Sequence, residues 1–155
     1  MDRLSDHLYI GDLVDARQES RHDELGIETV VTLTASSTAT TDIHRPLRDG
    51  CNAQTMFDSA ASAVVREIGN ERKILLHCAA GESRSVAVAT AVFALRDDLV
   101  IDDALQKVKS GSGDYTGRPT ANPDERLMRS ASRYVESAGG RCHNIFQLRP
   151  PTTIQ

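Results

Sequence analysis

The chain has 155 residues, 39% of them hydrophobic and 26% charged, with a formal net charge of -4. The length and composition predict one globular domain. The negative net charge does not fit a nucleic-acid-binding protein, which usually has an excess of basic residues. The three cysteines have no short paired spacing, the first residues are too polar for a signal peptide, and no apolar run is long enough for a membrane span. We therefore expect a monomeric cytoplasmic protein with reduced thiols that binds neither DNA nor a membrane.

The first third of the chain has the pattern of an α/β protein. Residues 8–10 form a short apolar run before Gly11, and the polar stretch 12–25 has the spacing of one or two short helices that end at Gly26. Residues 28–33 are rich in β-branched side chains and predict a strand buried on both faces.

The middle of the chain continues with a weak strand and a strong helix. Residues 43–47 contain Pro46, which favours an edge strand, and residues 48–50 form a predicted turn. From residue 56 to residue 68 the apolar positions recur at helical spacing.

Residues 73–77 predict a central strand, and residues 85–95 are apolar almost all round, which indicates a buried central helix. An amphipathic helix follows over residues 101–108. Asn122 precedes a proline and is expected to cap a last helix that runs to about Glu136. We expect one folded domain over residues 1–138 and a tail over residues 139–155.

The segment from His77 to Ser85 reads His-Cys-Ala-Ala-Gly-Glu-Ser-Arg-Ser and carries the chemistry. A strand, a glycine-containing loop and a helix in this order bring several backbone N–H groups to one anion at a helix N-terminus. Helix N-termini and nearby cations lower the pKa of a cysteine thiol, and Cys78 has both available. Arg84 closes a C-x5-R spacing that lets its guanidinium grip two phosphate oxygens. The expected substrate-binding residues are Ala79, Ala80, Gly81, Glu82, Ser83 and Arg84.

Two neighbours of this loop have more than one interpretation. The Ser85 hydroxyl is placed to donate to the thiolate when the thiolate leaves phosphorus, and it is also a candidate N-cap of the next helix. For His77 we favour a support that orients the loop over a proton-transfer role.

At these residues the sequence resembles the dual-specificity branch of the protein-tyrosine phosphatase superfamily. Its signature H-C-x-x-G-x-x-R-S is met at all five fixed positions, and residues 8–11 and 26–31 look like the first two strands of the family. The resemblance covers roughly residues 4 to 137. It implies a three-layer α/β fold with a short central mixed sheet flanked by helices. It also implies hydrolysis of phosphotyrosine, phosphoserine or phosphothreonine in proteins, through a phosphocysteine intermediate and without a cofactor.

The resemblance further implies an aspartate upstream of the cysteine that acts as general acid and base. Asp49 is our choice, because it follows the edge strand and precedes the helix near residue 56. Asp42 lies before that strand and Asp58 lies on the helix itself. The alternative for Asp49 is a plain Asp-Gly turn.

Substrate and activity leave alternatives open. The acidic Glu82 should repel a highly phosphorylated inositol headgroup, which favours protein phosphoesters. The segment from residue 49 to residue 57 is short by comparison with typical members of the family, which suggests a shallow pocket. The alternatives are a phosphatase of RNA 5′-phosphates or small phosphate esters, and a phosphate-binding module without turnover.

Three further residues have a special and an ordinary interpretation. Cys51 is a candidate for a protective disulfide with Cys78, against a plain loop residue. Arg118 is a candidate for a second phosphate or an acidic partner, against a solvated arginine. Cys142 is followed by His143, and two adjacent ligands near a terminus do not make a metal site, so no metal is expected.

Overall fold

The computed structural model describes residues 1–139 of the protein. In chain order its elements are β1 (Asp2–Arg3), β2 (Leu8–Gly11), α1 (Leu13–Ala16), α2 (Glu19–Leu25), β3 (Thr29–Thr32), β4 (Ile43–His44), α3 (Gln54–Gly69), β5 (Ile74–His77), α4 (Arg84–Arg96), α5 (Ile101–Ser110) and α6 (Glu125–Ser137). The strands form one sheet in the order β1-β2-β5-β3-β4. Only the pairing of β1 with β2 is antiparallel, so the expected mixed sheet is confirmed.

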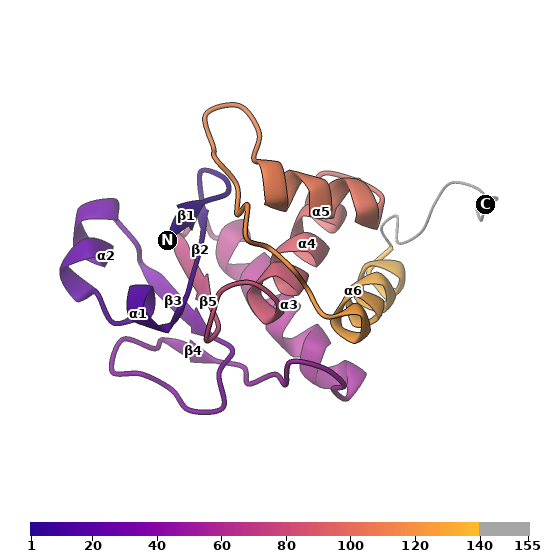
Figure 1. Ribbon diagram of the computed structural model, residues 1–155, viewed down its shortest axis with the longest axis horizontal. Helices are drawn as coiled ribbons and strands as arrows, with labels where there is room; N and C mark the ends of the chain where they lie inside the picture. Colours follow the sequence, from indigo (N-terminus) through magenta and orange to yellow (C-terminus); the bar gives the residue numbers. More distant parts are fainter. Residues whose placement is uncertain (140–155) are drawn as a thin grey trace.

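The sheet is the middle of three layers, with α1 and α2 on one side and α3 to α6 on the other (Figure 1). Side chains alternate between the two faces along each strand. Ile74 and Leu76 of β5 belong to the main core beneath the larger group of helices. Leu75, between them, packs with Val30 of β3 and with Leu25 at the end of α2. The central strands are therefore buried on both faces, as the β-branched run predicted.

Helix α4 lies at the centre of the helical layer. Every residue from position 85 to position 94 is buried, and α4 contacts α3, α5 and α6. Alanines at every second or third position let the neighbouring helices approach closely. The prediction of a buried central helix is confirmed.

The parallel strands place the cysteine loop at one edge of the sheet. His77 ends β5 and pairs in register with Gly11 of β2 on one side and with Thr32 of β3 on the other. The connection from β2 to β3 runs over one face and the connection from β4 to β5 over the other. Such a switch point opens a crevice at the carboxyl ends of the strands, where α/β proteins bind ligands.

Three helix starts differ from the sequence prediction. Helix α3 begins at Gln54, two positions before the expected start. Helix α4 begins at Arg84 with Ser83 as its N-cap residue, one position before the expected start. Helix α6 begins at Glu125, and its N-cap is Asp124, whose carboxylate accepts the N–H of Arg126. The expected cap, Asn122, was wrong because its N–H donates to the carbonyl of Glu82 in the cysteine loop, which holds this segment outside the helix.

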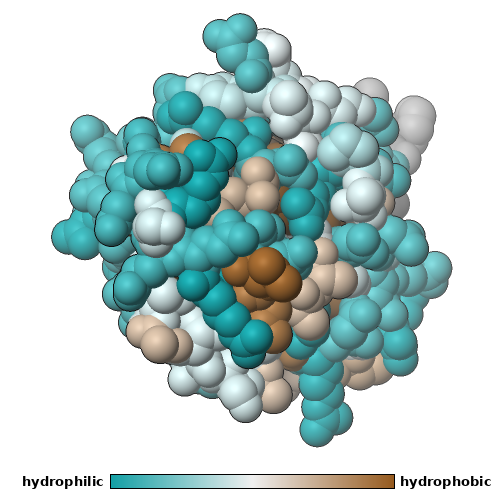
Figure 2. All heavy atoms as spheres, turned by 60° about the vertical axis from the view of Figure 1, so that its left-hand side comes forward, coloured by the Kyte–Doolittle hydropathy of each residue, from teal (hydrophilic) through white to brown (hydrophobic). Residues whose placement is uncertain are grey.

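The surface over α1 and α2 is mainly hydrophilic, with a small hydrophobic patch at its centre (Figure 2). Within residues 1–139, no helix has both the length and the apolar character needed to cross a bilayer. Most of the expected tail lies outside the described residues.

Candidate active site

Cys78 follows β5 directly and is 2% exposed. Its Sγ accepts the N–H of Gly81 at 3.3 Å and lies 3.2 Å from the Oγ of Ser85. Ser85 is buried in the first turn of α4, so the N-cap interpretation of this residue is wrong. Its contact with the sulfur is the geometry expected of a hydroxyl that stabilises a thiolate.

The carbonyl groups of loop residues 78–82 each have a hydrogen-bond donor from outside the turn. The carbonyl of Cys78 faces Nδ1 of His77 at 3.3 Å. The carbonyl of Ala79 accepts the N–H of Leu13, the first residue of α1, at 3.0 Å. Both donors come from elements that the sheet itself positions.

The next three carbonyls are held by the segment between α5 and α6. The guanidinium of Arg118 donates to the carbonyl of Ala80 at 3.2 Å and to that of Gly81 at 3.1 Å. The N–H of Asn122 donates to the carbonyl of Glu82 at 2.7 Å. Five consecutive carbonyls are thus fixed on the outside of the loop.

The outer ring of donors, which consists of His77, Leu13, Arg118 and Asn122, sets the direction of the inner N–H groups. In a trans peptide the C=O and the following N–H point in opposite directions. Because carbonyls 78–82 face outward, the N–H groups of residues 79–83 face the other side, and that of Gly81 reaches the sulfur. The loop therefore has the geometry of an anion cradle, with Cys78 at its base.

Arg84 links the cradle to the predicted acid segment. Its Nη1 donates to the carbonyl of Leu47 at 3.1 Å. A guanidinium has five N–H donors, so this bond leaves enough of them for two phosphate oxygens. Arg84 lies at the start of the helix that follows the loop.

A chain of hydrogen bonds connects His77 to Thr32 at the end of β3 and then to the loop between β3 and β4. The Nδ1 of His77 faces the Cys78 carbonyl, which only accepts, so Nδ1 carries the proton and Nε2 accepts from Thr32 at 2.7 Å. The Thr32 oxygen then accepts from Thr41 at 2.7 Å, and the Thr41 oxygen accepts the N–H of Thr38 at 2.9 Å. Burial lowers the pKa of His77, which favours this neutral form. The geometry is that of a supporting residue, as predicted.

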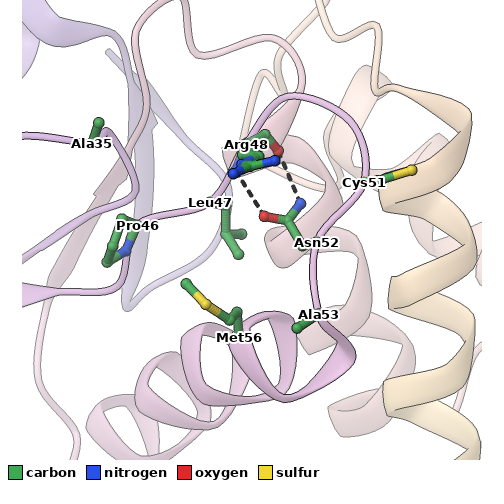
Figure 3. Close-up of a pocket in the computed structure, with 8 residues that line it drawn as sticks. All are labelled: Ala35, Pro46, Leu47, Arg48, Cys51, Asn52, Ala53 and Met56. Carbon is green, nitrogen blue, oxygen red and sulfur yellow. Dashed lines mark hydrogen bonds between the residues drawn. The ribbon is translucent and has the colours of Figure 1, made fainter.

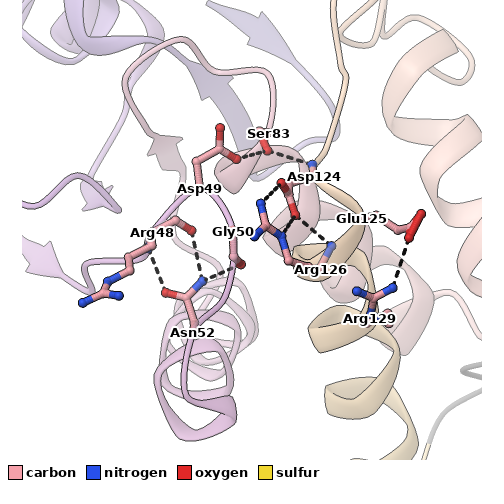
Figure 4. Close-up of polar contacts among 9 residues, drawn as sticks. All are labelled: Arg48, Asp49, Gly50, Asn52, Ser83, Asp124, Glu125, Arg126 and Arg129. Carbon is pink, nitrogen blue, oxygen red and sulfur yellow. Dashed lines mark hydrogen bonds and ion pairs between the residues drawn. The ribbon is translucent and has the colours of Figure 1, made fainter.

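Asp49 is the one predicted acid that contacts the cysteine loop. It is exposed, and its Oδ1 accepts the Ser83 hydroxyl at 2.5 Å (Figure 4). Asp42 instead accepts the N–H of Val30 near the start of β3, and Asp58 accepts an amide of its own helix. Neither alternative contacts the loop among the described residues.

The segment that carries Asp49 is a closed turn. The side chain of Asn52 accepts the N–H of Arg48 at 2.8 Å and donates to the carbonyls of Arg48 and Gly50 at 3.0 and 3.2 Å (Figure 4). The guanidinium of Arg126 packs against Gly50 from α6. The hydrogen bond and the negative charge of Asp124 are the main causes that raise the pKa of Arg126, and Cys51 makes a smaller contribution. Asp49 thus projects from a braced loop.

The residues that brace the site could not be recognised from the sequence. Arg118 is not a solvated arginine, because its side chain is 12% exposed and forms an ion pair with Asp2 at 2.9 Å besides its bonds to the loop. The acidic partner foreseen as one alternative therefore lies inside the chain itself. Asn52 carried no recognisable signal, since a polar residue in a loop is common, and Asn122 was expected to cap α6 and not to hold the cysteine loop.

Cys51 and Cys78 are both free thiols, the first exposed and the second buried. Cys142 and His143 lie outside the described residues. Within residues 1–139, no three His, Cys, Asp or Glu side chains are grouped to hold a metal ion.

Beside the acid segment lies a hollow of about 600 Å³ (Figure 3). Its walls are mainly apolar, and the side chain of Arg48 lies at its border. The lining residues are Ala35, Pro46, Leu47, Arg48, Cys51, Asn52, Ala53 and Met56. The hollow is distinct from the cradle around Cys78, but the two share the segment that carries Asp49.

No protein-family model matches the sequence, and no curated protein matches it significantly. Solved structures do match it. Human DUSP28 superposes with a TM-score of 0.75 at 22% identity, over 88% of this chain and 96% of that chain. DUSP15 gives 0.76 at 21% identity, over 90% of both chains. A mouse putative dual specificity phosphatase gives 0.75 at 23% identity, over 88% of this chain and 86% of that chain.

The chain has the dual-specificity phosphatase fold. The three-layer α/β architecture implied by the sequence resemblance is thereby confirmed. The loop from His77 to Ser85 occupies the switch point of this fold, after the central strand.

Proposed function

We propose that the protein is a phosphomonoesterase of the dual-specificity phosphatase type, with Cys78 as its nucleophile. The observation that carries the proposal is the set of five outward-held carbonyls in the cysteine loop. They turn the N–H groups of residues 79–83 toward the position of a phosphoryl group above the sulfur. Donors fixed in advance stabilise charge in a transition state without reorganisation.

In the first step, the Cys78 thiolate attacks phosphorus and an S–P bond forms while the P–O ester bond breaks. Arg84 and the loop N–H groups hold the non-bridging oxygens. Asp49 transfers its proton to the leaving oxygen, so that a neutral alcohol or phenol departs.

In the second step, water attacks the phosphocysteine and gives up a proton to the Asp49 carboxylate. The S–P bond breaks, orthophosphate is released, and the electron pair returns to sulfur. The Ser85 hydroxyl, 3.2 Å from Sγ, stabilises the thiolate as it leaves.

Phosphorylated proteins are the proposed substrates. Asp49 and Glu82 are exposed, so the phosphoryl site is reachable by a side chain of a large partner. The hollow beside Asp49 offers room for residues that flank the phosphorylated one. The negative charge of Glu82 disfavours heavily phosphorylated headgroups.

The first test is hydrolysis of p-nitrophenyl phosphate by the purified protein. Cys78→Ser should lower kcat by roughly a thousandfold or more, because it removes the nucleophile. Cys51→Ser is the matched control, since Cys51 is an exposed free thiol outside the cysteine loop and p-nitrophenyl phosphate has no flanking residues to fill the hollow that Cys51 lines. A Cys78→Ser variant that retains full activity would refute the mechanism.

The substrate class needs a separate test. We expect a higher kcat/KM for phosphopeptides than for an RNA 5′-phosphate, a nucleotide or a sugar phosphate at equal concentration. An Asp49→Ala variant, which retains the cradle, should capture phosphoproteins that mass spectrometry then identifies. Equal or faster turnover of the small esters would instead favour that alternative.

A further inference from the structure

The hydroxyl of Ser83 joins three parts of the site. It donates to Oδ1 of Asp49 and accepts the N–H of Asp124 at 2.9 Å (Figure 4). A hydroxyl has one proton, and the Asp124 N–H takes an acceptor position, so the Ser83 proton goes to the Asp49 carboxylate. The loop, the acid segment and the start of α6 therefore meet at one oxygen atom.

This hydroxyl has no role as a helix cap. Ser83 is the N-cap residue of α4, yet its side chain forms no capping hydrogen bond. Its carbonyl accepts the N–H of Ala87, and that bond does not depend on the side chain. The contribution that a serine normally makes at an N-cap is therefore absent here.

The two carboxylates beside Ser83 are not equivalent. Hydrogen bonds from Arg126 lower the pKa of Asp124 to about 2, so this group stays ionised and cannot deliver a proton at neutral pH. Ser83 is the hydrogen-bond partner of Asp49, and no second partner of that carboxylate occurs among the described residues. The orientation of the Asp49 side chain on its braced loop therefore depends on one contact, the Ser83 hydroxyl.

We propose that Ser83 is a positioning residue that holds Asp49 over the phosphate cradle, so that the acid faces the leaving oxygen. The proposal rests on the proposed function. When Asp49 carries its proton on Oδ2, the Ser83 hydroxyl still donates to Oδ1. The proton passes from Asp49 to the leaving oxygen, and the Ser83 proton is not consumed.

The test compares substrates whose leaving groups differ in their need for an acid. Phenyl phosphate expels a more basic oxygen than p-nitrophenyl phosphate, so it depends more on proton transfer. We expect Ser83→Ala to lower the ratio of kcat for phenyl phosphate to kcat for p-nitrophenyl phosphate by about tenfold, part of the full contribution of a general acid. Ser83→Thr retains a hydroxyl and should restore most of that ratio.

A double-mutant cycle separates this role from a structural one. In an Asp49→Asn background there is no acid to position, so adding Ser83→Ala should leave the ratio unchanged. If Ser83 only docks α6 on the loop, Ser83→Ala will lower kcat for both substrates by the same factor in either background. That result would overturn the proposal.

The remaining outcomes are distinct. If Asp49→Asn does not change the ratio, Asp49 is not the acid and the role of Ser83 fails. The proposed function survives that outcome as long as wild type hydrolyses p-nitrophenyl phosphate and Cys78→Ser does not. If wild type hydrolyses neither ester, both proposals fail. Urea unfolding of each variant confirms that the rates belong to folded protein.

Discussion

At position 81 the backbone leaves no room for a side chain. Gly81 has φ of +71°, a conformation that costs an L-residue roughly 1–2 kcal/mol. A Cβ there would lie 2.5 Å from Nη2 of Arg118 and 2.7 Å from the carbonyl oxygen of Gly11. The glycine therefore serves both the turn of the loop and its contact with the arginine that fixes two carbonyls.

We predict that Gly81→Ala lowers kcat/KM for p-nitrophenyl phosphate by about a hundredfold, the effect of losing one well-placed N–H donor. The matched control is Gly113→Ala, because Gly113 also has a positive φ, of +61°, but a Cβ there meets nothing within 4 Å. That variant should lose about 1 kcal/mol of folding free energy with kcat/KM unchanged. Equal losses of activity in the two variants would contradict this explanation.

The sequence predicted the residues whose chemical type and spacing are restricted. Cys78 and Arg84 could be proposed as site residues because a thiol and a guanidinium separated by five residues, between a strand and a helix, suit one task. Arg118 was ambiguous, since an arginine in a loop is usually solvated. Its role depends on the path of the chain after α5, which places Arg118 in contact with Gly81, 37 positions earlier in the sequence.

Among elements, the segment from residue 118 to residue 124 supplies several of the hydrogen bonds that hold the cysteine loop. It contributes Arg118 and Asn122 to the outside of the cysteine loop and the N–H of Asp124 to Ser83. Helix α6 starts at Glu125, after the predicted cap Asn122, because the N–H groups of Asn122 and Asp124 form hydrogen bonds with the cysteine loop. The existence of α3, α4, α5 and α6 followed from apolar periodicity, whereas the starts of α4 and α6 did not, because tertiary hydrogen bonds set them.

Replacing Arg118 by methionine preserves length and removes the donors. We expect Arg118→Met to lower kcat/KM by about tenfold to a hundredfold, because displaced N–H groups bind the phosphoryl group poorly. Arg129→Met is the control, since Arg129 is 58% exposed and pairs with Glu125 on the surface of α6. Its effect on folding should stay below about 0.5 kcal/mol, with activity retained. Steady-state kinetics and urea unfolding measure both quantities.

For the whole molecule, the buried neutral His77 links stability to pH. Burial lowers the pKa of His77 in the folded state relative to about 6.5 in the unfolded chain. Between the two values the unfolded chain binds a proton that the folded protein excludes. The contribution is complete above the unfolded pKa and is lost as pH falls toward the folded pKa.

We therefore predict that the free energy of unfolding falls between pH 7 and pH 5, with at most about 1.4 kcal/mol per pH unit from this residue. Urea unfolding at several pH values measures the slope, and His77→Gln should flatten it. NMR titration of the His77 ring tests the cause directly. A midpoint at or above the unfolded value would contradict the prediction.

The outer ring of donors around the cysteine loop has a consequence for how the protein behaves in solution. A cradle that is assembled in advance does not distinguish a phosphoryl group on a substrate from free orthophosphate. We expect the reaction product to compete with substrate. Orthophosphate should also raise the melting temperature, as any ligand of the native state does, because it adds about 2.7 kcal/mol to the free energy of unfolding at a concentration one hundred times its Kd. Phosphate buffer would make the protein harder to unfold and slower at the same time.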